Sequence, residues 1–185
     1  MPDGVDAGGY RYTPAPAAPP WNAPWIWLPG GTPKDCAAAY FRKNITLDAL
    51  PQRVMARISA DTIYRLYVNG RMVSRGPADP GNDFAPHDRW SHQWLYDLRD
   101  LTPFFEKGMN VIAAEVFTKG EPNYSLGKHG FVLEAEIDVP GKPRVFIATG
   151  PDWRALSSTA WSIGRVHAGG SERVTRFVSA IRCHL

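Results

Sequence analysis

The chain has 185 residues, of which 44% are hydrophobic and 21% are charged, a composition that fills one hydrophobic core and excludes disorder throughout. Lys and Arg total 21 against 18 Asp and Glu, and this net charge of +3 gives no reason to expect nucleic-acid binding. No apolar run approaches the roughly 18 residues that cross a bilayer, and no signal peptide is visible. We therefore expect no membrane partner, and a cytoplasmic location unless an incomplete N-terminus hides export to the periplasm or beyond.

Residues 1–24 are predicted to form a disordered, extended arm. Prolines are frequent among Ala and Gly in this segment, and such a composition buries too little apolar surface to offset the entropy of ordering. A folded domain is expected over residues 25–161. Residues 162–185 are expected to form a basic tail, because Glu172 is their only acid against Arg165, Arg173, Arg176 and Arg182.

The spacing within residues 25–161 predicts an all-β domain. Short apolar stretches are separated by Gly, Pro, Asn and Asp, and no 3.6-residue period lasts beyond two turns. The segments 53–60 and 130–138 alternate between apolar and polar residues, which is typical of a strand with one buried face. Glu134, Glu136 and Asp138 are expected on the wet face of the second segment. Further strands are predicted at 40–47, 63–68, 94–98, 111–118 and 144–149, which together indicate an antiparallel β-sandwich.

Two turn signals organise these strands. Asn69-Gly70 predicts a tight hairpin within Tyr67–Val73, because both residues accept the positive φ angles of a type I′ turn. Residues 96–113 are predicted to form a strand, a short helical or turn region, a glycine turn at Gly108 and another strand.

An ordered set of short motifs runs through about residues 24–161. These motifs are Trp25-Ile26-Trp27, Tyr40-Phe41-Arg42-Lys43, Ala60-Asp61 with Tyr64, Leu66-Tyr67-Val68-Asn69-Gly70, Arg75-Gly76-Pro77, Tyr96-Asp97-Leu98, Gly108 with Asn110-Val111-Ile112-Ala113, Gly130-Phe131 and Asp152-Trp153-Arg154. Together they resemble the non-catalytic β-sandwich domain near the N-terminus of bacterial α-L-rhamnosidases. A related Val-Asn-Gly hairpin occurs in the similar domains of β-galactosidase-type glycoside hydrolases.

This resemblance implies a jelly-roll sandwich of the galactose-binding-like type. In the enzymes that it resembles, such a domain is joined to an (α/α)₆ barrel whose carboxylic acids cleave terminal L-rhamnose with inversion. A barrel of that kind does not fit within 185 residues, and Gly169–Val174 departs from the pattern by which the family continues. The resemblance therefore implies an accessory domain that is truncated or separately encoded, with residues 162–185 unrelated to the family.

Among the predicted loops, the segment 76–94 is the richest in side chains of the kinds that bind ligands. Its candidate carbohydrate-binding residues are His87, Asp88, Arg89, Trp90 and Trp94, because Trp rings stack on the apolar faces of sugars while polar groups bond the hydroxyls. The alternative interpretation is that the two Trp side chains pack beneath the loop as a small satellite core.

The same loop contains a candidate metal site. Asp79, Asn82 and Asp83 offer the oxygen ligands that calcium prefers, but their spacing does not match an EF-hand, and they also suit simple turns. No other cofactor is expected, since the histidines and the two cysteines, Cys36 and Cys183, fit no zinc spacing. Nor do the loop carboxylates give reason to expect the acid pair of a glycosidase.

Three other features have both structural and functional interpretations. Asp61 is expected to cap backbone N–H groups at a turn. Trp25 and Trp27 are expected to clamp the edge of the sandwich and to serve packing. The loop 119–129, with Lys128-His129, is expected to add polar contacts at the same end as the segment 76–94.

Three functions are compatible with these observations. The first is an accessory domain that supports a glycoside-hydrolase catalytic domain, which an exposed apolar patch would mark. The second is a stand-alone carbohydrate-binding module for rhamnose or galactose-type sugars. The third is an independently active hydrolase, for which the residues give least support. The expected partners are thus a carbohydrate or a catalytic domain.

Overall fold

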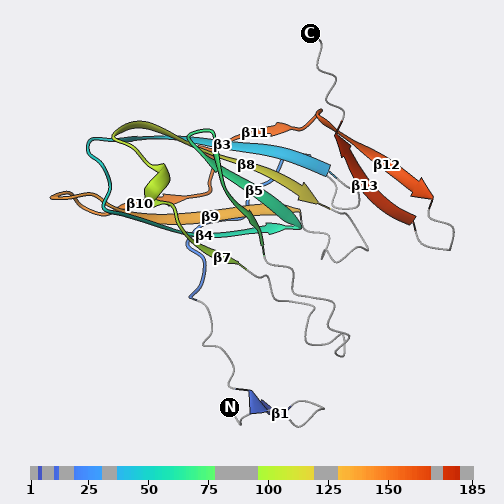
Figure 1. Cartoon of the computed structure of the whole chain (residues 1–185), viewed down its shortest axis with the longest axis horizontal. Coiled ribbons are helices and arrows are strands. Elements are labelled where there is room, and N and C mark those ends of the chain that lie inside the picture. Colours follow the sequence, from blue (N-terminus) through green and yellow to red (C-terminus); the bar gives the residue numbers. More distant parts are fainter. Residues whose placement is uncertain are drawn as a thin grey trace.

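The computed structural model describes residues 4–5, 11–12, 19–30, 37–77, 96–118, 129–167 and 173–179. Within these ranges the main body consists of two antiparallel sheets that lie face to face (Figure 1). In spatial order, the four-stranded sheet contains β10 (Val145–Ala148), β9 (Gly130–Asp138), β4 (Arg53–Asp61) and β7 (Asp97–Asp100). The five-stranded sheet contains β11 (Arg154–Ser157), β3 (Ala37–Leu47), β8 (Gly108–Thr118), β5 (Ile63–Val68) and β6 (Arg71–Gly76).

The prediction of an all-β jelly-roll sandwich is confirmed. Within the described ranges the helical structure amounts to one 3₁₀ turn, η1 (Thr102–Phe104), in the place where a short helical or turn region is predicted. No helix among those residues has the length and apolar character needed to cross a membrane. Two further antiparallel pairs, β1 (Gly4–Val5) with β2 (Arg11–Tyr12) and β12 (Trp161–His167) with β13 (Arg173–Ser179), lie in the segments predicted as arm and tail. The boundaries at residues 25 and 161 stay predictions.

Alternation along the strands builds the core between the sheets. The register of β4 and β9 places Val54 opposite Ile137 and Ala56 opposite Ala135, and these side chains are buried. The five-stranded sheet contributes other buried side chains, which include Phe41, Tyr64, Leu66, Val68, Ile112, Ala114 and Val116. Because burying a Val, Leu, Ile or Phe side chain stabilises a fold by about 1.5–3 kcal/mol, this shared core holds the two sheets together.

The predicted hairpin at Asn69-Gly70 is confirmed, and its asparagine does more than turn the chain. Asn69 and Gly70 have φ angles of 51° and 77°, as a type I′ turn requires. The Asn69 Oδ1 accepts a hydrogen bond from the Val111 N–H at 2.8 Å, while its Nδ2 donates to the Phe104 carbonyl at 2.9 Å. The turn is therefore tied to both η1 and β8.

The segment 19–28 lies along the four-stranded sheet. Ile26 and Phe131 exchange backbone hydrogen bonds of 2.9 and 3.0 Å, and Ala23 is buried. Trp27 contacts Phe41 with ring centroids 5.9 Å apart, which confirms its predicted packing role. Trp25 is 37% exposed and lies so close to Gly130 that a Cβ there would be 2.6 Å from the indole ring.

Candidate functional site

The residues predicted to bind carbohydrate lie outside the described ranges. These are His87, Asp88, Arg89, Trp90 and Trp94, and the same holds for the calcium candidates Asp79, Asn82 and Asp83. Both sites stay predictions. The chain is described up to Pro77 and again from Tyr96, so the two ends of the loop are known. They leave from β6 and β7, which are edge strands of different sheets.

A polar cluster, buried except for its arginine, joins these two edges. The Tyr64 hydroxyl donates a 2.5 Å hydrogen bond to Oδ2 of Asp97 and lies 3.3 Å from the Ser74 hydroxyl. Arg99 completes the cluster, with Nε 2.9 Å from the Ser74 Oγ and a terminal nitrogen 3.3 Å from Oδ1 of Asp97. The cluster thus connects β5 and β6 of one sheet to β7 of the other.

Burial, together with the hydrogen bond to Asp97, raises the pKa of Tyr64 above its ordinary value. The phenol therefore stays protonated near neutral pH and acts as a hydrogen-bond donor. Because Tyr64 is fully buried, its contacts are structural and do not face a ligand.

Gly76 allows the chain to pass this cluster on its way into the loop. A Cβ at this position would lie 1.8 Å from Oδ2 of Asp97 and 3.0 Å from the ring of Tyr64. Only a residue without a side chain fits there, since an added methyl group would occupy the space of the carboxylate. The glycine of the Arg75-Gly76-Pro77 motif is thus explained by close approach.

A second cluster lies on the outer face of the four-stranded sheet. Arg57 of β4 and Glu134 of β9 are directly opposite in register and form an ion pair whose side chains are 14% and 6% exposed. Glu134 Oε2 also accepts hydrogen bonds from the backbone N–H groups of Asn22 at 2.9 Å and Ala23 at 3.3 Å. The prediction that Glu134 lies on a wet face is therefore wrong: the segment 19–23 covers this carboxylate and is held by it.

The guanidinium of Arg57 also lies beside two aromatic rings. Its guanidinium lies 4.8 Å from the centroid of the Trp21 ring and 5.9 Å from that of Tyr96, and the two rings meet edge to face at 5.9 Å. Arg57 further donates to the carbonyls of Pro19 at 2.8 Å and Pro20 at 3.0 Å. Tyr96 is the first described residue after the loop, so this aromatic cluster adjoins the predicted binding segment.

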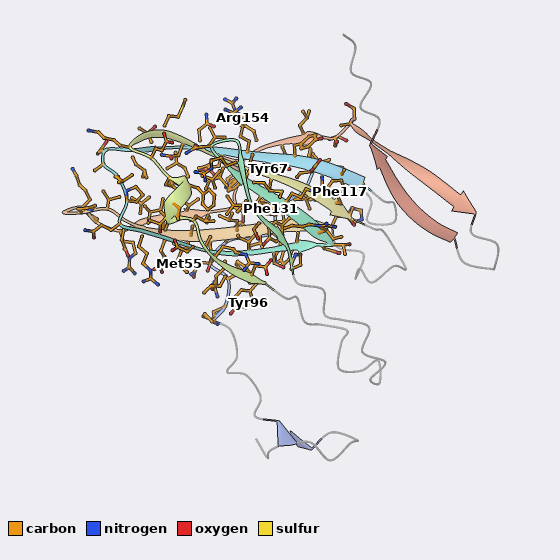
Figure 2. The ribbon with its side chains drawn as sticks, in the orientation of Figure 1. Met55, Tyr67, Tyr96, Phe117, Phe131 and Arg154 are labelled. Atoms are coloured by element: carbon orange, nitrogen blue, oxygen red, sulfur yellow. The ribbon has the colours of Figure 1, made fainter. Side chains whose placement is uncertain are left out.

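Beside this cluster lies a groove of about 330 Å³. Its lining combines polar groups with apolar side chains, and the residues that matter for binding are Asn22, Arg57, Glu134, Met55, Leu98 and Phe146. Leu98 and Phe146 are 54% and 48% exposed. Figure 2 shows Met55 and Tyr96 on the same side of the sandwich. The groove can hold either a small polar ligand with an apolar face or the side chains of a protein partner.

A wider groove of about 610 Å³ opens where β3 and β10 approach each other. Its charged residues, Lys43 and Asp152, form an ion pair with each other. Much of the remaining lining comes from β10 and the turn that follows it. Fewer polar side chains of this groove are therefore directed at a common point than in the smaller groove.

Two other predictions concern polar residues near the ends of the strands. Asp61 is buried, and its Oδ1 accepts a hydrogen bond from the Thr62 hydroxyl at 3.2 Å. His129 packs edge to face on Trp27 with centroids 5.2 Å apart. Within the described ranges no cluster of three or more His, Cys, Asp or Glu side chains is suited to hold a metal ion.

Sequence reasoning missed the residues of the aromatic cluster. Trp21 stands among prolines that indicate an arm, and the alternation of residues 53–60 predicts no more for Arg57 than a place on the polar face of its strand. The one available signal was charge: Arg57 and Glu134 lie on the outward faces of two strands that are both predicted to have one buried face. Without the register, nothing in the sequence places them opposite each other.

Comparisons with known proteins all match this chain to α-L-rhamnosidases or to proteins of the same fold. Residues 50–169 match the family described as the Alpha-L-rhamnosidase N-terminal domain. An α-L-rhamnosidase of Streptomyces avermitilis is 28% identical in an alignment of 127 residues, which covers 66% of this chain and 11% of that protein. The chain therefore spans about a tenth of the length of this curated relative.

Solved structures show the same fold. The GH78 family rhamnosidase of Bacillus sp. GL1 has a TM-score of 0.62 and 31% identity, over 78% of this chain and 14% of that one. The α-L-rhamnosidase from Dictyoglumus thermophilum has a TM-score of 0.62 and 17% identity, over 77% and 17% of the two chains. A lectin of Pleurotus ostreatus has a TM-score of 0.54 and 20% identity, over 74% and 35%. At such identities the last two similarities show the fold alone.

Proposed function

The chain belongs to the α-L-rhamnosidase N-terminal domain family, as its sequence motifs predict, and on this premise we propose that it serves as a non-catalytic accessory domain of an α-L-rhamnosidase-type glycoside hydrolase. In this role the sandwich packs against the catalytic part of the enzyme and stabilises it. Bond cleavage takes place outside the residues of this chain.

The observation that carries this proposal is how little of each relative the match covers. The matched segment is 11% of the Streptomyces avermitilis protein and 14% of the Bacillus sp. GL1 enzyme, so most of each enzyme lies elsewhere. Glu134 also supports it, because Arg57 and two backbone N–H groups occupy its oxygens and make it an anchor for the segment 19–23. A carboxylate held in this way is poorly suited to act as a general acid.

Exposed apolar side chains favour a docking partner. Leu98 and Phe146 lie on the outer face of the four-stranded sheet beside the groove, and Met109 and Leu156 of the other sheet are 69% and 67% exposed. Apolar side chains that lie together on a surface are typical of protein interfaces. We assign the docking contact to the face with the groove, because Met55, Leu98 and Phe146 lie together there.

A domain exchange tests the accessory role. The segment of the Bacillus sp. GL1 enzyme that matches this chain is either deleted or replaced by residues 19–161, which include the segment held by Arg57 and Glu134, and thermal unfolding and hydrolysis of an aryl α-L-rhamnoside are compared with the intact enzyme. We expect the deletion to lose stability and activity and the replacement to restore part of both. Replacement with Phe146→Ser should restore less. If the deleted enzyme behaves as the intact one, a supporting role is ruled out.

Carbohydrate binding is the second candidate, and the groove of about 330 Å³ favours it specifically. The exposed side chain of Asn22 supplies directed hydrogen-bonding groups there, while Met55 and Phe146 supply the apolar surface that a sugar ring covers. The Pleurotus ostreatus lectin shows that a related fold occurs in a sugar-binding protein. If Asp79, Asn82 and Asp83 bind calcium, the ion would serve carbohydrate binding.

Titration distinguishes the two candidates. The full chain is titrated with L-rhamnose and with galactose, with and without calcium, and heat or NMR shifts are recorded. Binding that Phe146→Ala weakens would support a sugar site in the groove. A flat response up to tens of millimolar sugar, which corresponds to less than roughly 3 kcal/mol, would leave docking as the function of this face.

A further inference from the structure

On the outer face of the five-stranded sheet, arginines lie directly opposite other arginines on the neighbouring strand. Arg42 of β3 is directly opposite Arg154 of β11, and Arg65 of β5 is directly opposite Arg75 of β6. Directly opposite residues of an antiparallel pair point to the same side, and like charges in this arrangement repel each other. The side is the outer one, because the neighbouring Phe41 and Tyr64 are buried in the core.

In the described part of the chain only one of these arginine pairs includes an arginine that forms an ion pair with a carboxylate. Glu115 of β8 lies 3.1 Å from Arg65 and neutralises it. Across residues 37–77, 96–118 and 129–160, neither Arg42 nor Arg154 forms an ion pair. On the other sheet, by contrast, Arg57 and Arg144 are both paired with carboxylates. The face of the five-stranded sheet thus has uncompensated positive charge.

Two tyrosine rings and a leucine side chain lie next to this charge. The register places Tyr40 opposite Leu156, next along the strands to the Arg42 and Arg154 pair, and it places Tyr67 across the small Ala113 from Arg42. The Arg42 Nε donates to Oδ1 of Asn44 at 3.1 Å, which orients the guanidinium. Figure 2 shows the Arg154 side chain directed away from the sandwich. We call Tyr40, Arg42, Tyr67, Arg154 and Leu156 the arginine face.

We propose that the arginine face binds an acidic polysaccharide through the carboxylates of its uronic acid residues. A guanidinium offers a planar fork that matches a carboxylate in two parallel hydrogen bonds, and two adjacent arginines are relieved of their repulsion when an anion lies between them. The rings of Tyr40 and Tyr67 suit the apolar faces of sugars. An exposed sheet face that extends over several strands suits an extended glycan chain better than it suits a single small molecule.

The inference rests on the proposed function, since it names the class of polysaccharide that an accessory domain of this family would hold near the catalytic part. Charge complementarity selects an anionic occupant, and the tyrosines select a glycan over a simple anion. Nucleic acid is a poorer fit, because its phosphate backbone is held by a denser set of basic residues than the few found here.

The test is a titration of the full chain with a short oligogalacturonate, monitored by calorimetry, against its methyl ester as the neutral control. We expect the acidic form to bind and the ester to bind at least tenfold more weakly, with an affinity that falls as salt is raised. Arg42→Gln and Arg154→Gln should each weaken binding roughly tenfold, because each removes a charge-assisted contact. Lys142→Gln, which removes one charge from the β9–β10 turn of the other sheet, should leave binding unchanged.

A second readout does not depend on calorimetry. Thermal unfolding of the unliganded chain should show Arg42→Gln and Arg154→Gln at or slightly above the wild-type midpoint, since cross-strand repulsion is relieved. Added oligogalacturonate should raise the midpoint of the wild type by more than that of these variants, because they bind it about tenfold more weakly. Tyr40→Ala should weaken binding more than Tyr40→Phe does.

Four results would overturn the proposal: no binding, equal binding of the methyl ester, unchanged affinity in both arginine variants, or equal binding of poly-L-glutamate. The last would identify a general acidic polymer or protein surface as the occupant. None of these results bears on the domain exchange described above, so failure of this inference and failure of the accessory role can be told apart.

Discussion

The hydroxyl of Tyr64 donates a 2.5 Å hydrogen bond to the carboxylate of Asp97, and this contact joins the two sheets at the base of the loop that begins after Pro77. Tyr64→Phe removes the donor and leaves a buried carboxylate with one partner fewer. We expect a loss of about 1.5–3 kcal/mol in the free energy of unfolding, measured by urea denaturation. Tyr67→Phe, on the outer face of the same strand, is the matched control and should change stability by less than about 0.5 kcal/mol. Equal stability of the two variants would contradict the role assigned to Tyr64.

Gly76→Ala tests the close approach at the same place. The added methyl group meets Oδ2 of Asp97 at 1.8 Å, so the carboxylate must move and its bond to Tyr64 is strained or lost. We expect a loss of about 1–3 kcal/mol in urea denaturation. The control is Gly150→Ala, where the nearest atom is 3.8 Å away, and which should be neutral or stabilising. A Gly76→Ala protein as stable as the control would show that the cluster tolerates displacement.

The Arg57 and Glu134 pair is expected to behave as a buried ion pair. Arg57→Met leaves the Glu134 carboxylate buried without its cation, at a cost of about 3–5 kcal/mol in the free energy of unfolding. The double variant Arg57→Met with Glu134→Met should recover part of this loss, because it removes both charges together. A double-mutant cycle by urea denaturation measures the coupling, and strictly additive losses would contradict the pairing.

Asp100 contributes to the free energy of unfolding by an amount that depends on pH. Its Oδ1 accepts hydrogen bonds from the Thr102 hydroxyl at 2.5 Å and from the Thr102 N–H at 2.9 Å, and these bonds hold the pKa of Asp100 below its ordinary value. A carboxylate with a depressed pKa stabilises the folded state above its unfolded pKa of about 3.9, and this contribution is lost as the pH falls through the folded pKa.

Asp100→Asn should therefore lower stability at pH 7 by about 0.5–1 kcal/mol, a small value because the side chain is exposed to solvent. The difference from the wild type should shrink as the pH falls below about 4, as followed by urea denaturation across pH. Asp48→Asn, in an exposed turn, is the control for loss of a carboxylate. A difference that stays constant down to the acid limit would rule out the carboxylate as its source.

Local patterns predicted the strands well where one face is buried. In β4 and β9 the two-residue period follows directly from the alternation of side chains, and the positive φ angles of Asn69 and Gly70 follow from their residue types. The strand β11 was missed because all of its residues are exposed, so its sequence has no alternation to detect. Its place beside β3 depends on pairing across more than a hundred residues.

The site was harder to predict for the same reason. The composition of residues 76–94 predicts a binding site in that loop. The described cluster of Trp21, Arg57 and Glu134 has another origin: β4 and β9 pair in one register, and a proline-rich segment lies over these two strands. The arginine face likewise exists only because β3 pairs with β11 in one register. Strand partners far apart in sequence create these sites, and no local motif specifies them.

The most direct measurement of the central claim is the release of nitrophenol from 4-nitrophenyl α-L-rhamnopyranoside by the purified full chain, followed from pH 4 to pH 8. A non-catalytic accessory domain should give a rate equal to that of buffer, while the intact Bacillus sp. GL1 enzyme serves as the positive control. Rhamnose release that scales with the concentration of the chain and copurifies with it would contradict the account.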